Sequence, residues 1–189
     1  MMPQPVIFPV TPDRWDDFEK LFGPRGACAG CWCMFWKLSR KEFDAGQGDA
    51  NRLAQNAIIA SGRTPGLIAY VDDVPAGWIA VEPRAEYGGL ARSRVLAPLD
   101  DTPVWSVSCF FVDKKFRRQG LTVALLKAAV EYVKLKGGKV VEGYPVETKD
   151  EKAPPAFIYT GTASAFQQAG FTEAGRRSEK RPIMRFVIE

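Results

Sequence analysis

The chain has 189 residues, 46% of them hydrophobic and 25% charged, which are ordinary proportions for a soluble protein and predict a single domain over residues 1–189. The formal net charge of +4 is too small to predict nucleic-acid binding, no apolar run approaches the ~20 residues of a membrane span, and no signal peptide opens the sequence, so we expect a cytoplasmic protein. The absence of histidine excludes Ser-His-Asp and Cys-His nucleophiles, histidine-bearing zinc sites and histidine as a general base.

The first third of the chain predicts one strand followed by helices. Thr11 and Pro12 are typical of the cap and the first residue of a helix, and Gly23-Pro24 is typical of a helix end. A further helix begins near Asp49, where apolar residues recur at helical spacing. The expected elements are a strand over 6–10, a helix over 12–22, a helical turn over 39–43 and a helix over 49–61.

The rest of the chain predicts alternating strands and helices. Valine and aromatic residues dominate the stretch before Val112, which favours a long buried strand, and Leu121 opens the strongest helical pattern. The expected elements are strands over 66–70 and 76–81 joined by a hairpin, an irregular stretch over 83–99, a strand over 102–112, a helix over 121–136, a strand over 140–144, a helix over 163–169 and strands over 171–176 and 183–188. The order β-α-α-β-β-β-α-β-α-β-β predicts an α/β domain around a mixed sheet.

The segment that best fits a binding function lies between the strand that ends at Val112 and the helix that begins at Leu121. Unpaired amides and the dipole at the start of that helix favour an anion. Arg117 and Arg118 add positive charge, and Gly120 lets the backbone approach a ligand closely. The glycine-rich stretches at 46–48 and 137–139 lack the residues or the strand-to-helix order of a dinucleotide or Walker loop. An ordinary solvated helix start is the alternative interpretation of the basic turn.

The turn Arg117-Arg118-Gln119-Gly120-Leu121-Thr122 resembles the Arg/Gln-x-x-Gly-x-Gly/Ala pyrophosphate loop of the GNAT superfamily of acetyl-CoA-dependent N-acetyltransferases. Also similar to that family are the stretches Phe111-Val112-Asp113, Pro75-Ala76-Gly77-Trp78 and Phe166-x-x-x-Gly170-Phe171. The resemblance implies a GNAT-like mixed central sheet flanked by helices, with acetyl-CoA as cosubstrate. It implies a small-molecule amine or a peptide as acceptor, without a nucleic-acid or membrane partner.

Two positions depart from the family pattern. Thr122 replaces the usual last glycine or alanine of the loop, which is tolerable if its hydroxyl faces the phosphate. Phe166 stands where many members place a tyrosine that protonates the departing thiolate. The resemblance therefore supplies the cofactor loop but not the general acid.

The resemblance also implies where acetyl-CoA binds. Its pyrophosphate would lie on the basic turn, and amides near the end of the preceding strand would act as an oxyanion hole for the thioester carbonyl. The residues implied in cofactor binding are Phe110, Phe111, Val112, Arg117, Arg118, Gln119, Gly120, Leu121 and Thr122.

The candidate catalytic groups are less well defined by the sequence. An attacking amine must lose a proton, and the stretch 104–108 lacks the carboxylate that the family usually places there. Glu82 and Glu142 are candidate bases, each with a purely structural carboxylate as the alternative. Tyr159 is the candidate acid, although a thiolate of pKa ~8.5 can also leave with help from water alone.

The sequence CAGCWCMFW over residues 28–36 holds three of the four cysteines among large aromatic residues. We interpret it as a lid over the acceptor pocket or a plug in the core, with the cysteines as small buried hydrophobic residues. The residues expected on the acceptor side are Trp32, Trp36, Trp78 and Tyr87.

Two alternatives remain from the sequence. One is a zinc-binding interaction module that uses Cys28, Cys31 and Cys33 with Cys109 as a fourth ligand, although we assign no metal. The other is a CoA-binding or regulatory domain that keeps the loop and lacks the catalytic acid and base. The sequence leaves the acceptor and the oligomeric state open, a homodimer included.

Overall fold

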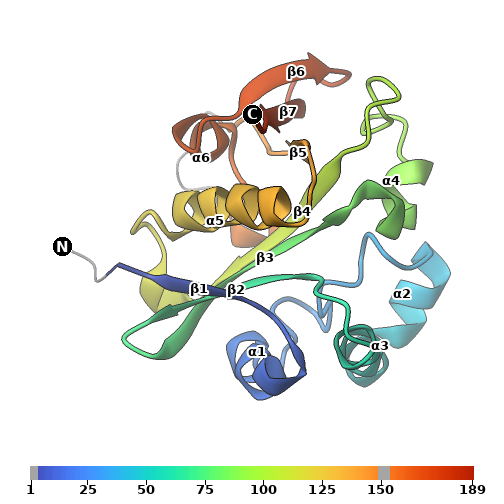
Figure 1. Ribbon diagram of the computed structural model, residues 1–189. Helices are drawn as coiled ribbons and strands as arrows, with labels where there is room; N and C mark the ends of the chain where they lie inside the picture. The colour runs from blue at the N-terminus through green and yellow to red at the C-terminus, as the bar shows by residue number, and fades with distance from the viewer. Residues whose placement is uncertain (1–3, 149–153) are drawn as a thin grey trace.

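The computed structural model describes residues 4–148 and 154–189 and shows one mixed β-sheet with helices on both faces (Figure 1). The strands are β1 (Val6–Pro9), β2 (Gly66–Val71), β3 (Val74–Pro83), β4 (Trp105–Val112), β5 (Val140–Gly143), β6 (Thr172–Arg176) and β7 (Pro182–Val187). The helices are α1 (Trp15–Phe22), α2 (Arg40–Gly46), α3 (Asp49–Ala60), α4 (Gly88–Arg92), α5 (Leu121–Leu135) and α6 (Ala163–Gln168). The strand order is β1-β2-β3-β4-β5-β7-β6, with β4 and β5 parallel and the other neighbouring pairs antiparallel.

Each face of the sheet is covered by its own hydrophobic core. Leu125 and Leu126 of α5 pack over one face, and Phe18 of α1 packs over the other. Figure 1 shows α5 on one side of the sheet and α1 with α3 on the opposite side. Because neighbouring strand residues point to opposite faces, β4 contributes Phe110 to the α5 core and Phe111 to the α1 core.

Local sequence signals fix the ends of the helices. Ser39 caps α2 through a reciprocal capping box, in which the Glu42 amide donates to Ser39 Oγ at 3.3 Å and the Ser39 amide donates to Glu42 Oε2 at 2.9 Å. Gly23 at the end of α1 has φ of +64°, and Gly120 before α5 has φ of +80°, both values that favour glycine. These two glycines end and begin helices where the sequence predicts.

The structure differs from the expected elements in several places. The helix expected over 12–22 opens as a 3-10 turn, Pro12–Arg14, before α1, and the strand expected over 76–81 extends from Val74 to Pro83. The helical turn expected at 39–43 is a full helix, α2. The stretch expected to be irregular contains the short helix α4, whose Gly89 amide donates to the Trp36 carbonyl at 2.7 Å. Strand β4 begins at Trp105, later than the expected residue 102, because Pro103 has no amide to donate to a neighbouring strand.

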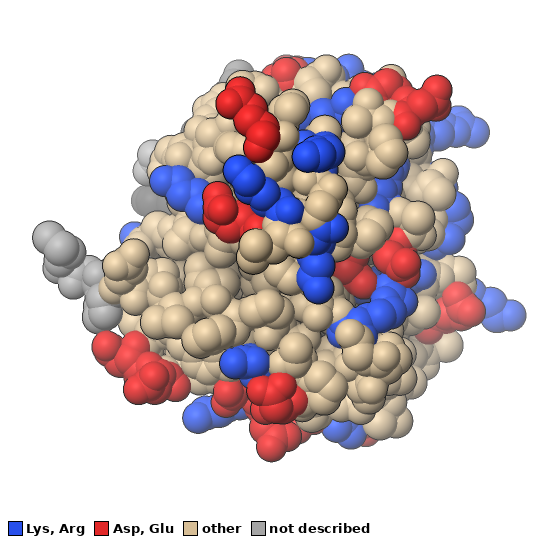
Figure 2. Space-filling model, in the orientation of Figure 1, with Lys and Arg blue, Asp and Glu red and all other residues tan. Residues whose placement is uncertain are grey.

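The charged side chains are dispersed on the face that Figure 2 shows. Lysine and arginine are interspersed there with aspartate and glutamate and do not form one continuous basic area. Within residues 4–148 and 154–189, no helix is long and apolar enough to cross a membrane.

Candidate active site

The sheet opens between β4 and β5. These two strands pair only over residues 105–107 of β4. The β3–β4 register passes over Ser108, which is therefore the extra residue of a β-bulge on β4. Beyond the bulge, the second half of β4 has no strand beside it on the β5 side among the described residues. The result is a gap near the centre of the sheet, which we call the β4–β5 gap.

The backbone of β4 presents amides to the β4–β5 gap. Amides of successive strand residues point to opposite sides, and the Asp113 amide donates to a β3 carbonyl at 2.9 Å. By alternation, the Phe111 amide faces β3, whereas the Phe110 and Val112 amides face the gap. The Phe110 amide donates to the Tyr159 carbonyl at 2.6 Å. Two of the three amides expected near the thioester thus face the gap, and one of these two already has an acceptor.

The basic turn lies at the end of this gap and opens α5. Gly120 and Arg118 have positive φ, which gives the turn its tight curvature. Arg117 Nε donates to the Val112 carbonyl at 2.9 Å, so this side chain is anchored to the end of β4. Gln119 Nε2 donates to the carbonyl of Lys115, just before the turn, at 2.9 Å. The first amides of a helix have no partner within the helix, so the start of α5 offers donors and positive charge at one place.

The hydrophobic residues of the expected cofactor site face the core with their side chains. Phe110 packs edge-on against Phe166, with ring centroids 6.1 Å apart, and the Leu121 side chain is buried in the same core. Phe111 packs against Phe22 of α1, with ring centroids 5.4 Å apart. A ligand in the gap would therefore meet these residues through their backbone. Phe166 is fully buried and has no proton to donate.

Glu82, a candidate base, lies at the end of β3 in an ion-pair cluster. Lys37 forms an ion pair with one carboxylate oxygen, and Arg63 lies 2.6 Å from the other. The Lys37 ammonium also lies 4.7 Å from the centre of the Tyr87 ring, within cation–π range. Both oxygens of Glu82 are therefore engaged, and its carboxylate holds the segment that contains Lys37 against the sheet.

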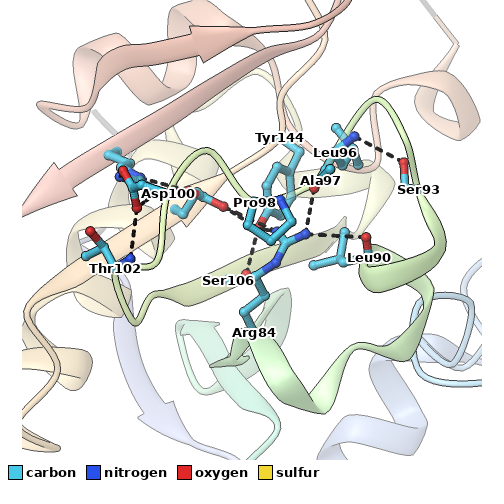
Figure 3. A network of polar contacts seen from close by, with 12 residues as sticks. Arg84, Leu90, Ser93, Leu96, Ala97, Pro98, Asp100, Thr102, Ser106 and Tyr144 are labelled. Carbon is cyan, nitrogen blue, oxygen red and sulfur yellow. Dashed lines mark hydrogen bonds and ion pairs between the residues drawn. The ribbon is translucent and has the colours of Figure 1, made fainter.

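Glu142, the other candidate base, is buried on β5 between two arginines. Arg185 Nε donates to Oε2 at 2.7 Å, and Arg84 lies 3.3 Å from Oε1. The Tyr144 hydroxyl also donates to Oε1 at 2.7 Å, and burial, followed by the Glu142 charge, raises the pKa of Tyr144. Figure 3 shows Arg84 pointing toward Tyr144 and Ser106, within a network that also holds main-chain carbonyls. Glu142 thus has the environment of a structural carboxylate.

Tyr159 lies beside the gap. Its carbonyl is bound to the Phe110 amide, and its ring stands edge-on to Phe35, with centroids 6.4 Å apart. Burial raises the pKa of Tyr159 to about 12, and nearby Cys109 adds to the increase. The phenol is therefore protonated at neutral pH, as a general acid must be, and it lies next to the segment 28–36.

The segment 28–36 is neither helical nor extended. It is a series of turns, and Trp32 and Cys33 have positive φ. Trp32 is buried and stacks on Phe22, with ring centroids 5.6 Å apart, and Trp78 is fully buried in the same core. Trp32 is therefore packed as a core plug would be. Neither Trp32 nor Trp78 lines an open surface.

Trp36 and Tyr87, the other two residues expected on the acceptor side, keep polar atoms without hydrogen bonds. Trp36 Nε1 and the Tyr87 hydroxyl are buried and have no hydrogen-bond partner among the described residues, although Ser108 lies near the Tyr87 hydroxyl. A small surface pocket of about 140 Å³ lies beside Trp36. It is lined by Phe35, Trp36, Leu38, Arg40, Phe43, Gly89 and Arg92.

The structure brings together two pairs of residues that lie far apart in the sequence, of which the zinc alternative had associated only the cysteines. Lys37 lies beside Glu82, and Cys33 lies beside Cys109 of β4. All four cysteines are free thiols. Within the described residues, no group of three or more cysteine, aspartate or glutamate side chains is arranged to hold a metal ion. Cys31, Cys33 and Cys109 pack in the hydrophobic core on the α1 face, whereas Cys28 is exposed.

A sequence profile decides the family of the chain. The profile of the acetyltransferase (GNAT) family matches residues 32–155, which is more than half of the chain. The chain belongs to the GNAT acetyltransferase family. The resemblance drawn from the basic turn is thereby confirmed. No curated protein matches the sequence.

Solved structures agree with this GNAT fold. An acetyltransferase of the GNAT family from Streptococcus agalactiae 2603 has a TM-score of 0.57 at 15% identity, over 100% of this chain and 98% of that one. PaiA N-acetyltransferase from Thermoplasma acidophilum, solved with coenzyme A, has a TM-score of 0.54 at 13% identity, over 98% and 99% of the two chains. A chain of the NatC complex bound to Gag peptide and CoA has a TM-score of 0.53 at 10% identity, over 98% and 99%. At these identities the likeness shows the fold alone, which is the mixed sheet flanked by helices that the sequence predicts.

Proposed function

We propose that this GNAT protein transfers the acetyl group of acetyl-CoA to a primary amine by direct attack of the amine on the thioester. The observation that carries the proposal is the β4–β5 gap, which is lined by outward-facing amides and ends at the basic turn that opens α5. Family membership supplies the activity class and acetyl-CoA as cosubstrate. The proposal adds that the acceptor is a primary amine.

The turn and the gap would bind different parts of acetyl-CoA. The unpaired amides at the start of α5, with the Arg117 and Arg118 side chains, would bind the pyrophosphate. The amides of Phe110 and Val112 would face the pantetheine arm and the thioester carbonyl, where negative charge develops during attack. The Phe110 amide can serve only after the Tyr159 carbonyl releases it, so binding includes a local movement of the chain at Tyr159.

Proton transfer is the second requirement. The amine must lose a proton, and the CoA thiolate must leave with or without one. Tyr159 is the proposed acid, because its phenol stays protonated at neutral pH and lies beside the gap. Glu142 is set aside as a base because two arginines and a tyrosine surround its carboxylate. Glu82 faces the same objection from Lys37 and Arg63.

The proposed acceptor is a small-molecule amine or a peptide. The NatC complex, one chain of which has a similar fold, was solved with both a Gag peptide and CoA bound. In this chain, Trp36 with the small pocket beside it, and the buried Tyr87 behind it, are proposed to lie on the acceptor side. The same cofactor site would serve for a small-molecule amine and for a peptide.

A CoA-binding domain without turnover is the second candidate, and two observations favour it. The Phe110 amide is bound to the Tyr159 carbonyl, and Phe166 has no acidic proton. Such a domain would bind acetyl-CoA at the same turn but would not polarise the thioester.

Two measurements separate these candidates. Isothermal titration calorimetry with acetyl-CoA tests the binding site, and chromatographic detection of free CoA and of acetylated product tests transfer to a polyamine, an arylalkylamine and a set of free amino acids and peptides. Binding with acetylated product supports the proposal. Binding without any product across this panel favours the non-catalytic domain, and the absence of binding contradicts both.

A further inference from the structure

The small surface pocket beside Trp36 is formed by three parts of the chain that pack together. Its lining residues come from the stretch just before α2, from α2 itself and from α4. Figure 1 shows α2 and α4 close to each other at one edge of the molecule. We call this pocket of about 140 Å³ the Trp36 pocket.

Hydrogen bonds to main-chain carbonyls hold the walls of the Trp36 pocket in place. The Gly89 amide donates to the Trp36 carbonyl at 2.7 Å, and Arg92 Nη2 donates to the Leu38 carbonyl at 2.7 Å. Gly89 permits this close approach, because a Cβ at this position would lie only 2.8 Å from the Trp36 carbonyl oxygen. The pocket is therefore preformed, as binding sites for small molecules usually are.

The inner wall of the Trp36 pocket is aromatic. Phe35 stands edge-on to both Trp36 and Phe43, with ring centroids 5.1 Å and 5.3 Å apart. Such walls favour another ring, because edge-to-face contacts between aromatic groups are stabilising. A cavity of ~150 Å³ holds one benzene ring. At about 140 Å³, the Trp36 pocket matches a single ring and is too small for a fused ring system.

Two arginines make the rim of the Trp36 pocket positive. Arg40 pairs with Asp44 at 2.7 Å on the exposed surface of α2, an interaction that water screens. Within the described residues, Arg92 forms no ion pair with a carboxylate, although its charge reaches Glu42. The guanidinium of Arg92 therefore keeps donors free beside an apolar wall. A planar guanidinium of this kind is suited to bind a carboxylate.

The Trp36 pocket adjoins Tyr159, the proposed acid. Phe35 lines the pocket and also stands edge-on to Tyr159, with ring centroids 6.4 Å apart. Burial raises the pKa of Tyr159 and the Trp36 indole partly opposes this increase, so the indole lies close to the phenol. The Tyr159 carbonyl in turn binds the Phe110 amide at the β4–β5 gap. One aromatic side chain thus separates the pocket from Tyr159.

Trp36 also holds an unused hydrogen-bond donor at this place. Its Nε1 is buried and has no hydrogen-bond partner among residues 4–148 and 154–189. Buried polar groups in proteins are nearly always paired with protein or with water. A ligand that extends from the pocket toward Tyr159 would supply the missing acceptor.

We propose that the Trp36 pocket binds the far end of the acceptor, and that the acceptor is a small primary amine whose other end is a single aromatic ring with a carboxylate. The ring would pack against Phe35 and Phe43, with the carboxylate at Arg92 and the amine beyond Phe35, at Tyr159. This inference rests on the proposed function and narrows its acceptor from amines and peptides to one class. Arg92 is a residue that determines specificity and takes no part in the chemical step.

The order of groups in the acceptor follows from the geometry. Arg92 lies at the rim, whereas Tyr159 lies on the other side of Phe35. A carboxylate at Arg92 and an amine at Tyr159 must therefore be at opposite ends of the ring. A free amino acid carries both groups on one carbon atom and cannot reach both places at once.

The first test measures binding to the Trp36 pocket without any amine. The probe is para-ethylbenzoate, and its uncharged counterpart is para-ethylbenzamide. In a nitrogen-15 NMR spectrum of the full chain, the five tryptophans give separate indole signals, and Trp36→Phe identifies the signal of Trp36. We expect the carboxylate to shift this signal at concentrations ~10- to 100-fold lower than the carboxamide. No shift of the Trp36 signal, or equal affinity for the two compounds, would overturn the proposal.

Arginine variants in the same titration show whether Arg92 holds the carboxylate. Arg92→Gln should weaken the binding of para-ethylbenzoate by ~10- to 100-fold, and Arg92→Lys should keep part of the affinity because it keeps the charge. The matched control is Arg94→Gln, since Arg94 is exposed nearby and does not line the pocket. Equal affinities in wild type and R92Q, or equal losses in R92Q and R94Q, would contradict the role of Arg92.

The second test measures acetyl transfer to para-(aminoalkyl)benzoates with side chains from aminomethyl to aminobutyl, each beside its carboxamide. We expect kcat/KM of the best carboxylate to exceed that of its carboxamide by ~10- to 100-fold. Phenylalanine, an isomer of para-(aminoethyl)benzoate with the amine next to the carboxylate, should be a poor acceptor. R92Q should remove the preference for the carboxylate while the rate on the carboxamide is retained, a result that a merely structural role of Arg92 would not give.

The proposed function and this inference fail in different ways. If wild type acetylates no amine of any class, the proposed function fails and the acceptor assignment fails with it. If wild type acetylates peptides, carboxamides or phenylalanine as well as it acetylates the para-(aminoalkyl)benzoates, the function stands and this inference alone is overturned.

Discussion

Glu82→Gln is the substitution that best separates a structural carboxylate from a catalytic one. The side chains of Lys37 and Glu82 are only 5% and 4% exposed, so the ion pair is buried. Removal of one partner of a buried pair leaves the other charge uncompensated, which typically costs ~3–5 kcal/mol. This is a large share of the ~5–15 kcal/mol by which a domain of ordinary stability resists unfolding.

The matched control is Asp44→Asn, because Arg40 and Asp44 form an ion pair with side chains 75% and 46% exposed. An exposed pair contributes ~0–1 kcal/mol. Urea denaturation followed by circular dichroism should therefore show a loss of ~3–5 kcal/mol in E82Q and a change within ~1 kcal/mol in D44N. Replacement of the whole pair, Lys37→Met with Glu82→Leu, should recover most of the loss, since no charge remains buried.

The opposite result would refute this reasoning. If E82Q keeps the wild-type free energy of unfolding while its rate of acetyl transfer falls by two orders of magnitude or more, Glu82 is the general base and not a structural carboxylate. The ion pair with Lys37 would then not be the main role of this carboxylate.

Three further predictions concern the cofactor turn, the core and acid stability. Gly120→Glu should abolish binding of acetyl-CoA in calorimetry while circular dichroism shows an intact fold. Gly120→Ala should lower the free energy of unfolding by only the ~1–2 kcal/mol of a left-handed residue, because a Cβ at this position meets no atom within 4 Å. Unchanged affinity in G120E would contradict the proposed cofactor site. Trp32→Ala should lower the free energy of unfolding by ~3–5 kcal/mol through the cavity it leaves, and a loss below ~1 kcal/mol in urea denaturation would show that Trp32 is not part of the core. The Arg185 guanidinium holds the pKa of Asp100 below its usual range, so this carboxylate stabilises the fold above the unfolded pKa of ~3.9 and loses that effect as pH falls through the lower folded value. Asp100→Asn should therefore reduce the drop in melting temperature between pH 6 and pH 3, and equal drops in both proteins would contradict the assignment.

The sequence predicted the parts of the fold that local chemistry determines. The apolar spacing that begins at Leu121 predicted α5, and the basic turn before it does open that helix. Gly120 marked the same boundary because its backbone has positive φ. These features depend on neighbours within a few residues, so one sequence contains the information needed to find them.

Long-range contacts determine what the sequence did not predict. The segment 28–36 places Trp32 and Cys33 at positive φ, a conformation that non-glycine residues adopt only when tertiary packing imposes it. α4 depends on the bond between the Gly89 amide and the Trp36 carbonyl, far away in sequence. Lys37 meets Glu82 across 45 residues. No local sequence pattern predicts these backbone conformations or these long-range contacts.

The Phe110 amide, which is proposed to bind acetyl-CoA, already donates a hydrogen bond to the Tyr159 carbonyl. The Tyr159 carbonyl and acetyl-CoA would therefore compete for the same donor. A backbone hydrogen bond of this kind contributes ~0.5–1.5 kcal/mol net, so its loss on binding would weaken acetyl-CoA by about two- to tenfold. Changes in the loop that carries Tyr159 would therefore tune affinity without touching any residue that contacts the cofactor. If Phe110 binds acetyl-CoA as proposed, the affinity would depend partly on how readily the main chain at Tyr159 moves away from its amide.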